Sequence, residues 1–188
     1  MILKILSFIL SVLFLSIGLL GCQQSGKEEN LKNSTNVANS ATQDMPTDMP
    51  SDFEFSIKFG VQKKNEINTF EGKVTKDLIS DGTATIKLTL TEEEMEDIYE
   101  KMKEINIAET KEFEPEPVNG TVCTKEPYEE DEWEIILNGE MITQSLSGKY
   151  CEPTKDAIQL IELRNFVFNI IKSKDEYKAL PDSQGAYL

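Results

Sequence analysis

Histidine is absent from this chain of 188 residues, and arginine occurs once, as Arg164. Without an imidazole, neither a Ser-His-Asp nor a Cys-His catalytic arrangement can be built. Zinc and iron sites that use histidine ligands are excluded for the same reason. The sequence also contains no P-loop and no glycine-rich dinucleotide fingerprint. Carboxylates are therefore the only plentiful residue type with catalytic chemistry.

Positive charge is also scarce, because 19 lysine and arginine residues stand against 34 aspartate and glutamate residues, for a net charge of −15. A surface of that sign repels nucleic acid and anionic lipid headgroups. It is compatible with cationic partners, including divalent ions, although solubility explains the charge without any partner. The sequence predicts no nucleic-acid ligand and no cofactor.

A long apolar run occurs only at the N-terminus, where residues 5–20 are almost wholly apolar and follow a short positive start ending at Lys4. This layout is typical of a secretory signal peptide, which we predict over residues 1–21. An uncleaved membrane-spanning helix is the alternative. Such a helix needs about 20 apolar residues, and this run has 16.

The apolar run ends in Leu19-Leu20-Gly21-Cys22, which resembles the lipobox of bacterial lipoproteins. The resemblance implies that Cys22 receives a diacylglycerol group and becomes the mature N-terminus after cleavage. Two acyl chains give stable anchoring, whereas one gives only marginal binding. The expected location is the cell membrane, with the protein lipid-anchored and facing outside the cytoplasm. The alternative is that Cys22 is merely a residue near a cleavage site.

Residues 22–50 are rich in Ser, Asn, Gln, Thr and Asp and show no apolar periodicity. Such a segment buries too little apolar surface to offset its chain entropy, so we expect a disordered tether. The remaining residues, 51–188, are numerous enough to form one acidic domain with a substantial core.

The first half of this domain shows a strand pattern followed by a helix pattern. A helix is expected from Thr91, because Glu94 stands at the capping-box spacing and apolar residues then recur at helical intervals. Alternating apolar residues predict three earlier strands, over residues 52–61, 67–78 and 83–90. A turn at Ser80-Asp81-Gly82 is expected between the last two.

The second half repeats strands and then a helix. We expect a short strand at 121–124 and a hairpin of 131–139 and 140–148 that turns at Asn138-Gly139. Thr154 should cap a second helix, which is apolar nearly all round and therefore buried. Together the elements predict a single α+β domain, in which an antiparallel sheet of about five to six strands is packed by two helices on one face.

Cys123 and Cys151 form a pair that, outside the cytoplasm, predicts a disulfide. Closing a loop of about 28 residues stabilises the fold by roughly 3.6 kcal/mol through lost chain entropy. A redox-active or nucleophilic pair is the alternative, but neither cysteine belongs to a CxxC motif.

The densest acidic cluster is EPYEEDEWE at residues 126–134, which could supply a glycosidase-like pair of carboxylates. Glu132 and Glu134 would be the acids, and Trp133 would stack on a sugar. Strand alternation turns Trp133 to the opposite face, which predicts a core tryptophan between exposed acids. The acidic residues 92–94 could hold a metal ion, but a helix N-terminus explains them without one, so no metal site is predicted.

Three segments of the folded part resemble small lipoproteins of Bacillus-like Gram-positive bacteria: NEINTFEGKVTKDL, TEEEMEDIYEKMKEI and KDEYKALPDSQGAYL. The resemblance implies an envelope lipoprotein and carries neither an activity nor a site residue. The expected function is a non-catalytic binding or interaction module, tethered to the membrane, whose ligand is an envelope protein or polymer. The alternative is a carboxylate-dependent enzyme acting on envelope glycans.

The C-terminus is unusually apolar for a chain end. We expect Tyr177, Leu180, Tyr187 and Leu188 to dock against the domain, because exposed apolar groups cost free energy. An exposed partner-binding tail is the alternative.

Overall fold

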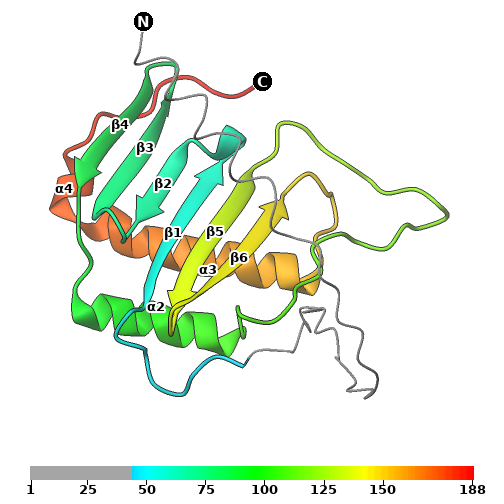
Figure 1. Cartoon of the computed structure of the whole chain (residues 1–188). Coiled ribbons are helices and arrows are strands. Elements are labelled where there is room, and N and C mark those ends of the chain that lie inside the picture. The colour runs from blue at the N-terminus through cyan, green and yellow to red at the C-terminus, as the bar shows by residue number, and fades with distance from the viewer. Residues whose placement is uncertain (1–43) are drawn as a thin grey trace, which may run out of the picture. The chain divides into compact units, whose positions relative to one another are not determined.

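The computed structural model describes residues 44–188, and Figure 1 shows how their elements are arranged. Six strands form one antiparallel sheet in the order β4-β3-β2-β1-β5-β6. Helices α2 and α3 lie on one face of it (Figure 1), which confirms the predicted α+β class. The elements are β1 (Glu54–Gly60), η1 (Val61–Lys63), β2 (Asn65–Asn68), β3 (Lys73–Ile79), β4 (Gly82–Lys87), α2 (Glu92–Glu104), β5 (Glu130–Leu137), β6 (Glu140–Ser147), α3 (Lys155–Ser173) and α4 (Asp175–Lys178).

The core lies between the sheet and the two long helices, because β1 and β5 alternate apolar and polar side chains. Ile57 of β1 is the register partner of Trp133 of β5, and both side chains are fully buried on the helix-covered face. On the opposite face Lys58 is the register partner of Glu132. The alternation therefore gives the sheet one apolar face and one polar face, as antiparallel sheets commonly have.

The segment 67–78, predicted as one strand, is two strands joined by a turn. β2 ends at Asn68, whose side-chain carbonyl accepts the Glu71 N–H at 3.0 Å, and β3 begins at Lys73. Gly72 has φ +58°, a conformation that glycine adopts without the penalty of a side chain. The single-strand prediction was wrong because the turn at Thr69–Gly72 carries little sequence signal. It has no proline, and its single glycine stands at its end.

The predicted caps and the hairpin turn are confirmed. The Thr91 hydroxyl accepts the Glu94 N–H at 3.2 Å and the Glu94 carboxylate accepts the Thr91 N–H at 2.9 Å, which is a complete capping box. Thr154 caps α3 by accepting the Ala157 N–H at 3.1 Å. Asn138-Gly139 joins β5 to β6 with φ values of +52° and +77°, the left-handed pair that a tight hairpin requires.

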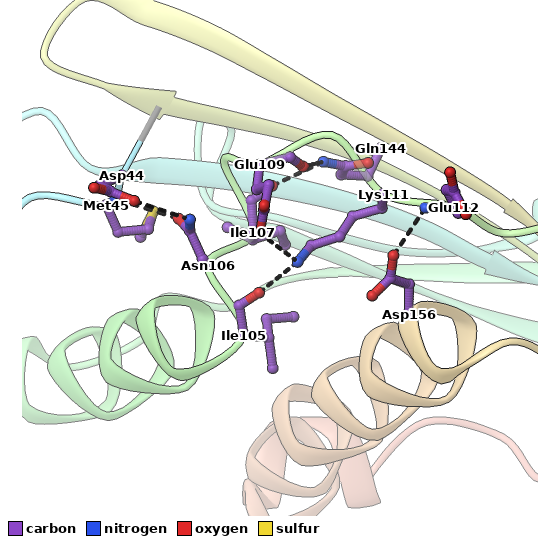
Figure 2. Close-up of polar contacts among 10 residues, drawn as sticks. All are labelled: Asp44, Met45, Ile105, Asn106, Ile107, Glu109, Lys111, Glu112, Gln144 and Asp156. Atoms are coloured by element: carbon purple, nitrogen blue, oxygen red, sulfur yellow. Dashed lines mark hydrogen bonds and ion pairs between the residues drawn. The ribbon is translucent and has the colours of Figure 1, made fainter. Parts of the chain in front are cut away.

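A long irregular connection runs from α2 to β5. Its first part is tied to the sheet by Gln144 of β6, whose side-chain amide donates to the Ile107 carbonyl at 2.8 Å (Figure 2). Figure 2 also shows Lys111, whose ammonium group donates to the Ile105 carbonyl at 2.6 Å. These contacts satisfy backbone carbonyls that follow the end of α2.

The strand predicted at 121–124 does not form a ladder. Val118 and Thr121 make an isolated antiparallel bridge, and Thr124 makes another with Tyr150. The prediction was wrong because Val118 and Val122 are exposed, so this stretch has no apolar face to bury against the sheet.

Residues 44–50, which belong to the expected tether, lie against α2. The Tyr99 hydroxyl donates to the Pro46 carbonyl at 2.6 Å, and the Lys103 ammonium group donates to the Thr47 carbonyl at 2.9 Å. Met45 and Met49 pack on the core. The contacts of the domain therefore begin before the expected boundary at residue 51. The segment binds through its backbone carbonyl groups, which accept hydrogen bonds from α2, and through two methionine side chains that pack on the core. Residues 22–43 lie outside the described residues.

The C-terminal segment docks on the domain except for its last residue. Tyr177 is buried, Leu180 is half-buried against the core, and the Tyr187 hydroxyl donates to the Asp77 carboxylate at 2.5 Å. Leu188 is fully exposed. The docking prediction is thus confirmed for the first three residues and wrong for Leu188.

Candidate functional site

The predicted disulfide between Cys123 and Cys151 is present, with a Cα–Cα distance of 5.4 Å. Beside it the Cys151 N–H donates to the Cys123 carbonyl at 3.1 Å, and the Lys125 N–H donates to the Lys149 carbonyl at 2.8 Å. These links fix residues 123–129 against the segment that leads from β6 to α3. The predicted lipidation residue, Cys22, lies outside the described residues.

The acidic cluster at 126–134 is divided between the two faces of β5. Trp133 is fully buried in the core, as predicted. Glu132 and Glu134 lie on the open face, where Lys63 contacts the Glu132 carboxylate at 2.5 Å and the Ser56 hydroxyl donates to Glu134 at 3.3 Å. Trp133 therefore cannot stack on a ligand held by these two acids.

The electrostatics of Glu132 also argue against a role as a general acid. The hydrogen bond from Lys63 lowers the pKa of Glu132 more than burial raises it, and the charges of Lys63 and Lys58 add smaller lowering effects. A general acid needs the opposite shift, toward the working pH.

Asp131 occupies a different environment, because strand alternation places it on the helix-covered face. Its register partners are Phe59 on β1 and Leu146 on β6, and its side chain is only 2% exposed. The only arginine of the chain, Arg164 of α3, lies opposite with its Nε 3.4 Å from the Asp131 carboxylate. Its Nη1 donates to Glu129 at 2.6 Å.

The protonation of Asp131 is strongly perturbed. Burial raises its pKa to about 7, Arg164 lowers it in part, and the negative charge of Glu129 raises it further. Asp131 Oδ2 and Arg164 Nε face each other at 3.4 Å as an ion pair without hydrogen-bond geometry, and neither atom has a hydrogen-bond partner among residues 44–188. Buried polar atoms of this kind cost roughly 1–3 kcal/mol each unless a partner is found. The site therefore holds a buried ion pair with poor hydrogen-bond geometry and an acid whose pKa is close to neutral pH.

A hollow of about 220 Å³ opens above these two side chains. A backbone hydrogen bond from Gly148 N–H to the Glu129 carbonyl, 2.8 Å long, closes one side of it. A Cβ at position 148 would lie 2.8 Å from that carbonyl oxygen, so only glycine permits this approach. The hollow is lined by Lys125, Pro127, Tyr128, Glu129, Asp131, Leu146, Gly148, Ile161 and Arg164.

Apolar walls with a few converging polar groups and a perturbed acid are the usual features of a ligand site. Pro127, Leu146 and Ile161 supply the apolar surface of this hollow, while Asp131 and Arg164 supply its buried charges. We call it the Asp131–Arg164 pocket. It can bind a polar group of either charge by hydrogen bonds, and it can exchange a proton.

A second hollow, of about 790 Å³, lies between residues 47–53 and α2. Its acidic residues are Asp48, Glu92, Glu96 and Glu100, and none of its lining residues is basic. The neighbouring Glu94 is occupied, because it completes the capping box and forms an ion pair with Lys174 at 2.5 Å. Residues 92–94 thus serve the helix N-terminus, in agreement with the sequence interpretation.

The Asp131–Arg164 pocket was not predicted, although two signals pointed to it. Asp131 is in phase with the core residue Trp133, and Arg164 stands on the apolar stripe of its helix. A charged residue in each of two buried patterns indicates an ion pair, because buried charges are seldom left alone.

Comparisons with known proteins leave the family open, since no protein-family model and no curated protein matches the sequence. Within residues 44–188, no group of three or more His, Cys, Asp or Glu side chains is placed to hold a metal ion. In the same part of the chain, no helix is long and apolar enough to cross a membrane.

Proposed function

We propose that the protein is a lipoprotein, anchored through Cys22 to the outer side of the cell membrane, whose domain is a non-catalytic binding module. The observation that carries the binding function is the Asp131–Arg164 pocket, in which a buried ion pair and apolar side chains line a hollow. The lipobox-like Leu19-Leu20-Gly21-Cys22 supports the anchor. The Cys123–Cys151 disulfide is consistent with an oxidising compartment.

The anchor is tested by metabolic labelling of the full chain with a fatty-acid analogue. Labelling should be lost in Cys22→Ser and retained in the double variant Cys123→Ser with Cys151→Ser, which removes two cysteines but leaves the motif intact. Equal labelling of Cys22→Ser and the unmodified protein would contradict the proposal.

The binding function is tested by nuclear magnetic resonance on the full chain. Signals of Tyr128 and of the backbone at Gly148, both of which line the pocket, should shift on addition of a ligand from a library of small acids, amines, sugars and peptides. If no compound class moves them, the pocket has no binding role.

The alternative, a carboxylate-dependent enzyme acting on envelope glycans, keeps one observation in its favour. Asp131, with its raised pKa, and Glu129 line the same hollow, and glycoside hydrolysis uses a pair of carboxyl groups. Against it, Arg164 contacts both carboxylates, and a side chain only 2% exposed is poorly placed to protonate a glycosidic oxygen. Hydrolysis of an envelope glycan that is abolished in Asp131→Asn would favour the enzyme.

A further inference from the structure

We propose that the Asp131–Arg164 pocket recognises a carboxylate group, which replaces Glu129 on Arg164 and binds together with one proton. This inference rests on the proposed binding function and specifies the chemistry of the ligand. The occupant is a small organic acid or the free C-terminus of a peptide, which share the same recognised group.

The arrangement of Arg164 carries the first part of the argument. A guanidinium has five N–H donors in a planar fork that fits a carboxylate. One donor, on Nη1, is taken by Glu129 at 2.6 Å, and Nε lies 3.4 Å from the Asp131 carboxylate as an ion pair without hydrogen-bond geometry. The site therefore already holds one carboxylate at the distance of a charge-assisted hydrogen bond, and a ligand carboxylate can take the same place on Arg164.

Glu129 is suited to being displaced. Its side chain is 57% exposed, so it can leave Arg164 and remain solvated. Because the carboxylate of this pair is exposed, separating it from Arg164 costs less than breaking a fully buried pair, and this limits the competition that it offers a ligand. The Glu129 backbone meanwhile stays in place, because its carbonyl accepts the Gly148 N–H.

Arg164, by contrast, is held in position. Its side chain is 9% exposed, its guanidinium carbon lies 5.7 Å from the centre of the Phe59 ring, and its Nε lies 3.4 Å from the Asp131 carboxylate. The pocket wall is fixed by the Cys123–Cys151 disulfide and by the hydrogen bond from Lys125 to Lys149. A binding group fixed before the ligand arrives loses less conformational entropy on binding.

The rest of the pocket limits the substituent. Its apolar walls, Pro127, Leu146 and Ile161, favour a short apolar side chain next to the carboxylate. The volume of about 220 Å³ is several times the space that one water molecule needs. A compact ligand end fits such a space, whereas a folded partner surface does not.

The proton follows from the groups that face Asp131. Phe59 on β1 and Leu146 on β6 are uncharged. The charged group on α3 is Arg164, and the loop contributes Glu129, Lys125 and the Tyr128 hydroxyl to the lining. A ligand carboxylate beside Asp131 adds a like charge at short range, which favours the protonated form of Asp131. Protonated Asp131 can then donate a hydrogen bond to the ligand, so binding takes up a proton and weakens as the pH rises.

The test is calorimetric titration of the full chain with acetate, butyrate, benzoate and a tripeptide that carries either a free or an amidated C-terminus. Binding is expected at pH 6 and should weaken by up to about tenfold per pH unit above pH 7. Glu129→Gln should bind several-fold more tightly, because the internal competitor is gone. Asp131→Asn should bind with little dependence on pH, and Arg164→Met should lose binding.

The outcomes separate the carboxylate inference from the binding function. Binding of the free but not the amidated tripeptide would identify a peptide C-terminus as the ligand. Binding of a small acid without binding of the tripeptide would identify a small organic acid. If no carboxylate binds either the unmodified protein or Glu129→Gln, the inference is overturned. Binding of amines or sugars that shifts Tyr128 would then leave the binding function standing. Circular dichroism shows whether Arg164→Met is folded. If Arg164→Met unfolds, the affinity of Glu129→Gln still tests the inference, because this variant changes an exposed side chain.

Discussion

Replacing Asp131 with asparagine should stabilise the protein at alkaline pH much more than at acid pH. Burial raises the pKa of Asp131 from 3.8 to about 7 in the folded protein. Between these pH values the folded state therefore binds more protons than the unfolded chain. The free energy of unfolding must fall as the pH rises through this window and, for this group, become constant above it. Asparagine cannot ionise, so the free energy of unfolding of the variant does not fall in this way as the pH rises.

The magnitude follows from the size of the shift. A change of about 3 pKa units at about 1.4 kcal/mol each gives a penalty of about 4 kcal/mol for fully ionised Asp131. Integrated between pH 5 and pH 8, the part of the penalty that develops is about 2–3 kcal/mol. Such an effect is large beside a total stability of roughly 5–15 kcal/mol.

The assay is urea unfolding of the full chain, of Asp131→Asn and of Glu130→Gln at pH 5 and pH 8. Glu130 precedes Asp131 on β5 and points to the other face, so its variant controls for the loss of one negative charge. The stability gained by Asp131→Asn should be about 2–3 kcal/mol larger at pH 8 than at pH 5. An equal gain at both pH values would refute the reasoning, because Asp131 would then ionise as it does in the unfolded chain.

Three further changes to the chain, one deletion and two sets of substitutions, test the fold. Deleting residues 185–188 removes the Tyr187 hydroxyl from Asp77 and should lower the melting temperature by a few degrees; an unchanged value would show that the docked tail is not stabilising. Replacing Cys123 and Cys151 with alanine should cost roughly 3.6 kcal/mol in urea unfolding, and a loss below 1 kcal/mol would contradict the loop-closure account. Thr91→Ala should cost about 1 kcal/mol, whereas Thr89→Ala, in the connection just before the cap, should be nearly neutral.

Local signals made most of the fold predictable. The capping box of Thr91 and Glu94, the Asn138-Gly139 turn and the alternation around Trp133 each depend on residues close in sequence, and each is found as expected. Two cysteines outside a CxxC motif were enough to predict their disulfide. Patterns with a physical cause inside one element are thus readable from the chain alone.

What could not be predicted depends on contacts between distant segments. The turn after Asn68 is fixed by that side chain and by Gly72, and no strong turn dipeptide marks it. The binding of residues 44–50 to α2 uses carbonyl groups that every sequence has. Asp131 and Arg164 are 33 residues apart, and only the crossing of α3 over β5 brings them together. Each of the two residues is in phase with its own buried pattern, but the pocket needs both elements in place.

The position of β1 has a mechanical consequence. The chain enters the domain along α2, held at Met45 by Asn106 and at Pro46 by Tyr99, and then runs into β1. A pull applied at Asp44 is thus borne first by these side-chain contacts and then by β1. Because β1 lies in the middle of the sheet, with β2 on one side and β5 on the other, it cannot be peeled away from an edge. A force applied from the N-terminal side of the domain therefore acts on β1, which is hydrogen-bonded to two neighbouring strands. The contacts along α2 should break before those of the sheet.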